Sequence, residues 1–316
     1  MASPSLRNRI RAWWEGYDGQ EYDAWLEARA RARAIKKQNG SDGPARRRSA
    51  FQRATAWEAA RIDISNQIWG EGYCGPGGPQ HVIDLVKLLG LTPEMSVLIV
   101  GGGLGGPARI LAKEYGCYVD AYEASKELVA AGTEMSLVAG LSKKATLEHY
   151  DFQKCPPFKR KYDAAVSMEA LYAVENKEGA LKAVQGAIKP CKLFVLTDYV
   201  LSDDVDPEDP DIQSWIENEP IEIFPVRNEA MIPLIEQADF NLRVKEDLSE
   251  AYRAVIARSW ANAGDLVQGL LDKGDEGRPL VDTLLREATL WARRSALLTK
   301  QKVHVMRYLA ERVWFD

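Results

Sequence analysis

A glycine-rich turn and an acidic residue further along the chain are the first features of this sequence that could carry chemistry. The turn, GGGLGG at residues 101–106, follows the apolar run at 96–100 and precedes a segment of helical pattern that begins at Pro107. Glycines let the backbone turn sharply and approach a ligand without Cβ clashes, and the helix that follows offers its amide donors. Glu123 closes the next apolar segment, where a carboxylate can accept both hydroxyls of a ribose. This arrangement predicts a site for an adenosine nucleoside.

Other polar and aromatic residues follow the later strands of the pattern. The glycine spacing also fits the dinucleotide fingerprint G-x-G-x-x-G, so the turn alone leaves NAD open. Asp151 and Phe152 come after the third predicted strand, where they can hold an adenine amino group and stack on its ring. Residues 167–172, with the sequence SMEALY, follow the fourth strand. The four cysteines form no CxxC pair, so no metal site is expected.

Short apolar strands alternate with helical segments in the middle of the chain, and these elements must position the residues above. We expect an α/β fold with a doubly wound, Rossmann-like sheet that is covered on both faces. A helix at 230–238 and a strand at 241–246 are expected at the sheet's edge, after an insertion at about 203–228. Strands are predicted at residues 96–100, 118–122, 145–149, 163–167 and 193–199, and helices at 81–90, 107–115, 126–139 and 177–188.

Both ends of the chain have a helical pattern and are predicted to be additions to this fold. Residues 1–64 are predicted to form a helical lid region, 65–248 the nucleoside-binding domain, and 249–316 a C-terminal helical extension whose last helix covers 286–315. That helix has a partial apolar stripe, for which core packing is the main interpretation and a homo-oligomer or lipid contact the alternative. The stripe comprises Leu290, Trp291, Leu297, Leu298, Val305, Leu309 and Val313.

Three stretches of the sequence resemble the class I S-adenosylmethionine-dependent methyltransferases, over about residues 65–250. Residues 97–125 are similar to the first motif of that class, and residues 162–190 to its fourth strand, acceptor loop and following helix. The sequence is most similar to the group of sterol C-methyltransferases, tocopherol methyltransferases and phosphoethanolamine N-methyltransferases, whose cofactor-covering segment residues 69–78 resemble. The resemblance implies S-adenosylmethionine as cofactor and a small or lipid-like acceptor. It leaves C-, N- and O-methylation open.

The resemblance also implies roles for individual residues. The glycine turn would line the methionine and ribose side of the cofactor, and Glu123 would hold the ribose. The residues after the third strand would hold the adenine, those after the fourth would lie beside the sulfonium, and Tyr73 would close over the site. The implied cofactor-binding residues are Gly101, Gly103, Gly105, Glu123, Asp151, Phe152 and Met168.

Two positions depart from the family pattern. Ile99 stands where the strand before the glycines usually ends in an acid, and Ala173 stands where the subgroup often has a histidine. A histidine base in this loop is therefore not expected. The departures motivate one alternative function, a catalytically silent methyltransferase-like subunit of a complex. An NAD-dependent oxidoreductase is a second alternative.

The candidate catalytic residues are Glu169, Tyr172 and Tyr73. Methyl transfer from a sulfonium is an in-line displacement for which the protein mainly supplies orientation. A base is needed only where the acceptor must lose a proton, and a carboxylate or an aromatic face is needed where positive charge develops. The structural alternatives are that Glu169 bonds backbone amides, that Tyr172 packs in the core, and that Tyr73 is a contact at the hinge of the lid.

Charge is distributed unevenly along this acidic chain. The 316 residues carry a net charge of −5, whereas residues 1–60 hold 12 Lys/Arg against 7 Asp/Glu. The net charge gives no case for nucleic-acid binding, and without a long apolar run or a secretory signal the protein is expected to be cytoplasmic. Trp13 and Trp14 lie beside arginines, which predicts either transient contact with an anionic membrane surface or packing of the N-terminal helices on the domain.

Overall fold

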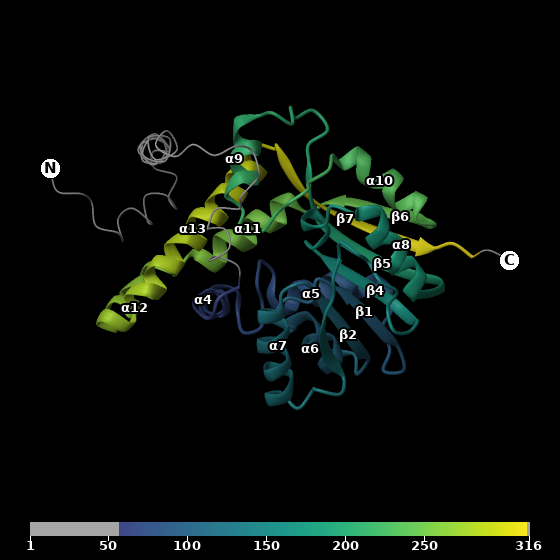
Figure 1. The fold of residues 1–316 in the computed structure, drawn as a ribbon, viewed down its shortest axis with the longest axis horizontal. Coiled ribbons are helices and arrows are strands. Elements are labelled where there is room, and N and C mark those ends of the chain that lie inside the picture. Colours follow the sequence, from purple (N-terminus) through teal and green to yellow (C-terminus); the bar gives the residue numbers. More distant parts are fainter. Residues whose placement is uncertain (1–56, 315–316) are drawn as a thin grey trace.

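One seven-stranded mixed sheet runs through the part of the chain that the structure, a computed structural model, describes, residues 57–314 (Figure 1). The strand order is β3-β2-β1-β4-β5-β7-β6. Strands β1 to β5 pair in parallel, whereas β7 runs antiparallel to both β5 and β6. The strands are β1 (Ser96–Val100), β2 (Tyr118–Glu123), β3 (Ala145–His149), β4 (Tyr162–Met168), β5 (Ile188–Leu201), β6 (Phe240–Asp247) and β7 (Val303–Arg312).

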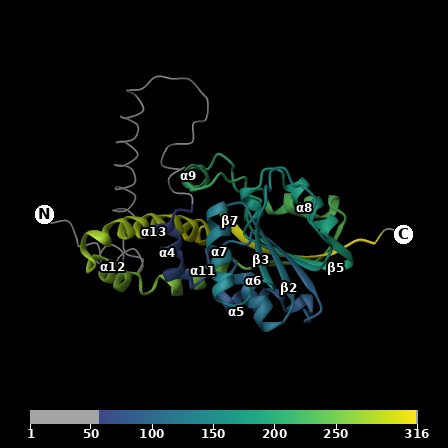
Figure 2. The same cartoon turned by 60° about the horizontal axis from the view of Figure 1, so that its bottom comes forward.

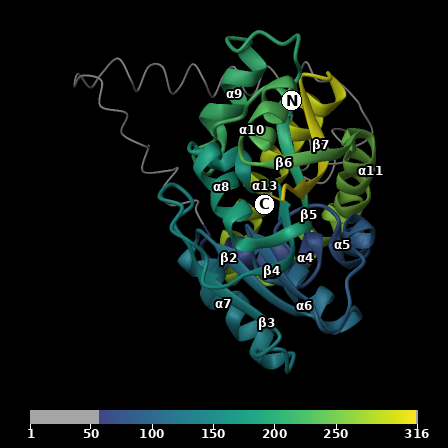
Figure 3. The same cartoon turned by 90° about the vertical axis from the view of Figure 1, so that its right-hand side faces the viewer.

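Helices cover both faces of the sheet, which explains why its central strands are apolar on both sides. In β1, Val97 and Ile99 face one core cluster, whereas Leu98 and Val100 face the other. Figure 3 shows α8 and α10 on one side of the strands and α5 and α11 on the other. The helices of the sheet domain are α5 (Gly78–Val86), α6 (Gly106–Glu114), α7 (Lys126–Val138), α8 (Lys177–Ala187), α9 (Pro210–Asn218) and α10 (Asn228–Gln237), with short 3₁₀ turns at Lys87–Leu89 and Leu171–Ala173.

A long helical excursion separates β6 from β7. It consists of α11 (Ser249–Trp260), α12 (Ala263–Leu271), a 3₁₀ turn at Gly274–Glu276 and α13 (Arg278–Thr299). Figures 1 and 2 show α13 as a long helix with α12 at its far end, away from the sheet. The helix α4 (Ala59–Trp69) packs against it, with the rings of Trp69 and Trp291 at 4.5 Å. The excursion therefore forms a second layer beside the N-terminal end of the described chain.

The prediction that the last helix covers 286–315 is wrong. Helix α13 ends at Thr299, and Val303–Arg312 forms β7 between β5 and β6, so the C-terminal extension 249–316 is not wholly helical. The segment VHVMRYLAER contains β-branched and aromatic residues that suit a strand. Over so short a length, its apolar spacing fits the period of a helix as well as that of a strand. Gln301, with φ 54°, makes the break between helix and strand.

The apolar stripe assigned to that helix lies in the core. Its members on α13 and β7 are at most 7% exposed, which agrees with core packing. A homo-oligomer or lipid contact through the C-terminal helices stays a prediction. Val313, beyond the end of β7, is only partly buried. The buried members are Leu290, Trp291, Leu297, Leu298, Val305 and Leu309.

The doubly wound sheet and its edge elements agree with the prediction, because α10 and β6 form the edge beyond β7. Most of the predicted lid region, including Trp13 and Trp14, lies outside the described residues. Its contact with membranes and its role as a lid stay predictions.

Candidate active site

The glycine turn is closed by hydrogen bonds to the strand beside it. The amides of Gly101 and Gly102 both donate to the carbonyl of Tyr122, at 2.9 Å each. The amide of Gly103 donates to Oε2 of Glu123 at 2.9 Å, and Oε1 of the same carboxylate accepts from the Ser125 amide at 2.9 Å. The acid at the end of β2 therefore lies directly against the turn after β1.

Burial and backbone amides act in opposite directions on Glu123. Burial raises the pKa of its carboxyl above the ordinary value, while the amides of Ser125 and Gly103 favour the ionised form and hold that rise down. Each carboxylate oxygen is thus fixed by one backbone donor. An ionised carboxylate has about four acceptor positions, so acceptor capacity remains for a ligand.

The segment at residues 69–78 lies over the start of α6. The Gly72 carbonyl accepts from the Gly106 amide at 2.9 Å, and the Gly72 amide donates to Oδ1 of Asn66 at 2.7 Å. A Cβ placed on Gly103 would lie 3.3 Å from the sulfur of Cys74, and one on Gly106 would lie 3.0 Å from the ring of Tyr73. This segment therefore covers the glycine turn.

Burial makes both side chains of this covering segment poor acids. It raises the pKa of Tyr73 to about 12 and that of the Cys74 thiol to about 12, so both stay protonated near neutral pH. A thiolate nucleophile at Cys74 is therefore disfavoured. Tyr73 contacts the glycine turn, as expected of a covering residue.

Glu169, directly after β4, has a strained backbone and a side chain held by hydroxyls. Its φ is 44°, and its amide donates to the Thr197 carbonyl at 2.8 Å. Its Oε1 accepts from the Thr197 hydroxyl at 2.6 Å and from the hydroxyl of Tyr252. The alternative that Glu169 merely bonds backbone amides is therefore wrong.

The electrostatic environment of Glu169 places its titration near neutrality. Burial raises the pKa of its carboxyl to about 7, while the hydroxyls of Thr197 and Tyr252 and the charge of Arg294 oppose that rise. The loop that carries it also approaches the glycine turn, because a Cβ on Gly101 would lie 2.4 Å from the Cβ of Ala170. Glu123, at the end of β2, and the loop that carries Glu169 thus lie on either side of the same turn.

Tyr172 belongs to a buried polar cluster instead of an open loop. Its hydroxyl accepts from Nη2 of Arg294 at 3.0 Å, and Arg294 donates to both carboxylate oxygens of Glu219 at 2.8 Å. The indole of Trp215 also donates to Glu219, at 2.6 Å. Burial raises the pKa of Tyr172 to about 12, and its ring lies against Tyr199 at 5.4 Å. These contacts support the packing interpretation of Tyr172.

The remaining predicted residues lie at the ends of β3 and β4. Asp151 accepts from the amides of Gln153 and Lys154 at 3.1 and 3.2 Å, and the Lys154 ammonium holds the pKa of its carboxyl below the ordinary range. Phe152 is 7% exposed and its ring lies 4.7 Å from that of Tyr150. Met168 ends β4 and pairs with Thr197 on β5. None of these positions is in conflict with the predicted roles.

Sequence reasoning missed the polar residues that β5 and α11 bring to this site. Besides Thr197 and Tyr252, Asp198 is fully buried in β5, and its Oδ1 accepts from the Tyr172 amide at 3.1 Å. Burial raises the pKa of Asp198 to about 8 and lowers that of Lys177 to about 8, and the attraction between the two charges opposes both changes. The polar pair TD inside the apolar run KLFVLTDYV was the available signal.

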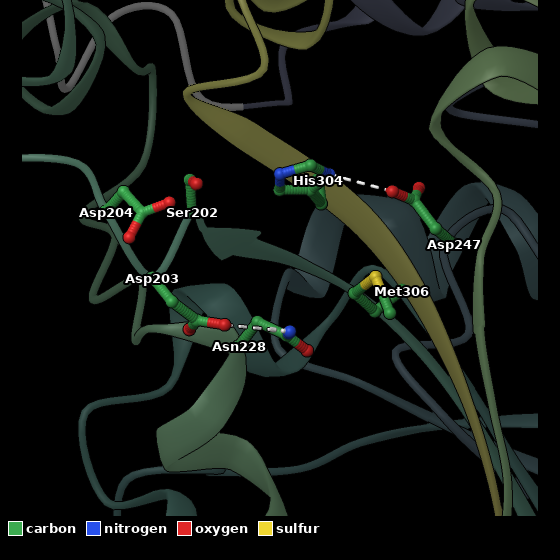
Figure 4. Close-up of a pocket in the computed structure, with 7 residues that line it drawn as sticks. All are labelled: Ser202, Asp203, Asp204, Asn228, Asp247, His304 and Met306. Atoms are coloured by element: carbon green, nitrogen blue, oxygen red, sulfur yellow. Dashed lines mark hydrogen bonds and ion pairs between the residues drawn. The ribbon is translucent and has the colours of Figure 1, made fainter.

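A separate pocket of about 170 Å³ lies where β5 and β6 end and β7 begins, beside Asp203 and Asp204 (Figure 4). Two of its acids already have partners, since Asp203 accepts from Asn228 at 3.2 Å and Asp247 bonds the ring of His304 at 2.8 Å. Within residues 57–314, no group of three or more His, Cys, Asp or Glu side chains is arranged to hold a metal ion. The pocket is lined by Ser202, Asp203, Asp204, Asn228, Asp247, His304 and Met306.

Comparison with known proteins identifies the family. Residues 78–243, more than half of the chain, match the family described as Methyltransferase domain. The chain belongs to this family. The predicted class I S-adenosylmethionine-dependent methyltransferase, with that cofactor, is thereby confirmed at the level of the family, and neither alternative function gains support.

The names of curated relatives of this methyltransferase indicate different acceptors. It is 29% identical over 173 residues to a sterol 24-C-methyltransferase of Yarrowia lipolytica, covering 54% of this chain and 45% of that protein. It is 24% identical over 211 residues to phosphoethanolamine N-methyltransferase 1 of Zea mays, covering 64% of this chain and 39% of that protein. The chain thus spans less than half the length of these curated relatives.

A solved structure shows the same fold. Phosphoethanolamine N-methyltransferase 2 of Haemonchus contortus, in complex with phosphomonomethylethanolamine and S-adenosylhomocysteine, superposes with a TM-score of 0.73. The superposition covers 86% of this chain and 62% of that chain at 16% identity.

Among the helices that the structure describes, none is long and apolar enough to cross a membrane.

Proposed function

We propose that this chain binds S-adenosylmethionine at the glycine turn and transfers its methyl group to a small or lipid-like acceptor beside Glu169. The observation that carries the proposal is that the Glu123 carboxyl and the loop that carries Glu169 both lie against the turn after β1. Glu123 ends β2 on one side of β1, and Glu169 follows β4 on the other. This is the point where the strand order reverses, and ligands of open α/β sheets bind there.

The residues around the turn fit the adenosine part of the cofactor. Glu123 has one backbone donor on each carboxylate oxygen and retains acceptor capacity for two ribose hydroxyls. Gly101 and Gly103 have φ values of 78° and 53°, which side chains disfavour. We propose that Gly105, Asp151, Phe152 and Met168 also bind this cofactor. When bound, the cofactor supplies a methyl group activated on a sulfonium.

Glu169 is the residue to which we assign proton transfer. With its pKa raised to about 7 by burial, it is partly ionised at neutral pH and can take a proton from an acceptor N–H or O–H group. The same carboxylate can instead stabilise positive charge on the acceptor. The Tyr172 hydroxyl accepts a hydrogen bond from Arg294 in the core, and we assign no proton transfer to it. Tyr73 is assigned to the cover of the cofactor.

The names of the relatives guide the choice of acceptors to test. Sterols and phosphoethanolamine differ in the methylated atom, so they separate C- from N-methylation. Both are compatible with the small or lipid-like acceptor that we propose. We retain a cytoplasmic location with transient membrane-surface contact as part of the proposal.

The test begins with calorimetry on the full chain. We expect S-adenosylhomocysteine to bind and NAD, as the matched control, to give no heat of binding. Transfer of a labelled methyl group from S-adenosylmethionine is then measured separately with phosphoethanolamine and with a sterol that has an unsaturated side chain. Absence of S-adenosylhomocysteine binding would contradict the proposed function whatever the acceptor.

A further inference from the structure

A chain of hydrogen bonds leads from Glu169 to two helices outside the cofactor fold. The hydroxyl of Tyr252, on α11, bonds Oε1 of Glu169. The same hydroxyl lies 3.2 Å from Nε2 of His81, on α5, and the two rings meet edge to face at 5.2 Å. Residues 81, 169 and 252 come from three elements that are far apart in the sequence.

The chemistry of the groups sets the direction of these bonds. An ionised carboxylate only accepts, so the Tyr252 hydroxyl donates to Glu169 and its oxygen is left to accept from His81. That requires the neutral histidine tautomer with its proton on Nε2. Burial lowers the pKa of His81, with repulsion from Arg307 in the same direction and attraction from Asp84 opposing it. The His81 ring is therefore neutral near neutral pH.

The groups packed around Glu169 leave Tyr252 as its donor from outside the sheet. Thr197, on β5, donates to the same oxygen at 2.6 Å. Arg294, on α13, attracts the carboxylate, whereas the charge of Asp198, also on β5, repels it. Tyr199 stays neutral because burial raises its pKa far above the ordinary value. Of these neighbours, Thr197 and Tyr252 are the two whose hydroxyls bond Glu169 directly.

Tyr252 is placed rigidly enough to orient its partner. It is 1% exposed within the main core cluster, and α11 packs against both α13 and β7. Glu169, in contrast, has a strained left-handed backbone that a packed environment must hold in place. The fixed hydroxyl of Tyr252 can therefore select the rotamer of the carboxyl group.

We infer that Tyr252 is a positioning residue that holds Glu169 toward the acceptor, and that His81 in turn fixes the Tyr252 hydroxyl. This inference rests on the proposed function, because it assigns the pair to the same reacting carboxyl. It means that the excursion between β6 and β7 and the helix after the covering segment both control the proton affinity of Glu169. Loss of the Tyr252 donor destabilises the ionised form of Glu169, so it raises the pKa of that carboxyl.

The test is an infrared pH titration of the full chain, with and without S-adenosylhomocysteine. The carboxyl band of Glu169 is assigned by its loss in Glu169→Gln. In Tyr252→Phe we expect the titration midpoint to rise by about one pH unit or more, since one donor to the charged form is lost. The acidic limb of kcat, measured with whichever of phosphoethanolamine or the sterol is methylated, should move in the same direction. Tyr308→Phe, which removes a buried hydroxyl bonded to Asn228, is the matched control and should leave the midpoint unchanged.

His81 gives an independent pair of variants. His81→Phe should raise the midpoint by less than Tyr252→Phe does, and His81→Gln, which keeps an N–H donor, should restore it toward the wild-type value. A Tyr252→Phe protein that folds and keeps the wild-type midpoint would overturn the inference. If Tyr252→Phe does not fold, equal midpoints in His81→Phe and wild type would overturn it. Failure to bind S-adenosylhomocysteine would instead remove the proposed function, and the titration of the chain alone still reports whether Tyr252 controls Glu169.

Discussion

The pH dependence of stability offers a direct measurement of the environment of Glu169. Burial raises the pKa of this carboxyl from 4.5 to about 7, so the folded protein holds the proton more tightly than the unfolded chain does. The stability contributed by this proton is fully present below pH 4.5 and is lost as the pH rises through 7. The difference between the two pKa values corresponds to about 3 kcal/mol. Glu169 is only partly buried and solvent screens its charge, so that figure is an upper bound.

Glu169→Gln removes this titration while keeping an oxygen that can accept from Tyr252 and Thr197. Urea unfolding of the full chain, measured from pH 4.5 to pH 8.5, gives the free energy of unfolding of both proteins. We expect the variant to gain stability relative to wild type as the pH rises, by about 2–3 kcal/mol across the range. Asp198 titrates in the same window, and the charge of Glu169 raises its pKa. The variant removes that repulsion, which adds to its gain in stability at high pH. Curves that run parallel across the range would refute the raised pKa and the role built on it.

Three further outcomes follow from the site. Glu123→Ala should lower the affinity for S-adenosylhomocysteine at least tenfold in calorimetry, with the circular dichroism spectrum unchanged, because hydrogen bonds to a charged group contribute about 1.5–3 kcal/mol each; an unchanged Kd would show that the ribose lies elsewhere. Arg294→Met should lower the free energy of unfolding, measured in urea, by about 3–5 kcal/mol, because it leaves the buried charge of Glu219 without its ion-pair partner. A change in this free energy smaller than the experimental error would contradict the prediction. Gly101→Ala should weaken both stability and S-adenosylhomocysteine binding, because φ is 78° and its Cβ would meet a neighbour at 2.4 Å. Gly186→Ala, at a helical position with open space, is its control and should do neither.

The parts of the fold that local signals specify could be predicted from the sequence. The run SVLIV has no polar residue and therefore suits a strand buried on both faces. The glycines after it and Glu123 at the end of β2 lie within one β-α-β unit, so their proximity follows from the connection itself. The sequence predicts that the turn and Glu123 belong to one nucleoside site, and the hydrogen bond from the Gly103 amide to Glu123 places the two side by side.

The remaining contacts depend on pairings between distant segments. Tyr252 and Glu169 are 83 residues apart, and no periodicity in either segment indicates that they meet. The strand β7 was missed for a related reason, because its stability comes from pairing with β5 and β6 on both sides and not from its own sequence alone. Arg294 is buried against Glu219, a pairing between residues 75 positions apart that neither segment indicates.

The position of β7 determines where the helices between β6 and β7 must lie. Because β6 and β7 are paired neighbours, the chain between them must leave the sheet and return to it, and α11, α12 and α13 occupy that path. The excursion brings Tyr252 to Glu169 and Arg294 to Tyr172, whereas the glycine turn and Glu123 come from the opposite half of the sheet. The contact of the turn with Glu123 thus lies within one β-α-β unit, whereas the contact of Glu169 with Tyr252 depends on the excursion between β6 and β7. Under the proposed function, the excursion therefore belongs to the acceptor side of the site, and the glycine turn with Glu123 to the cofactor side.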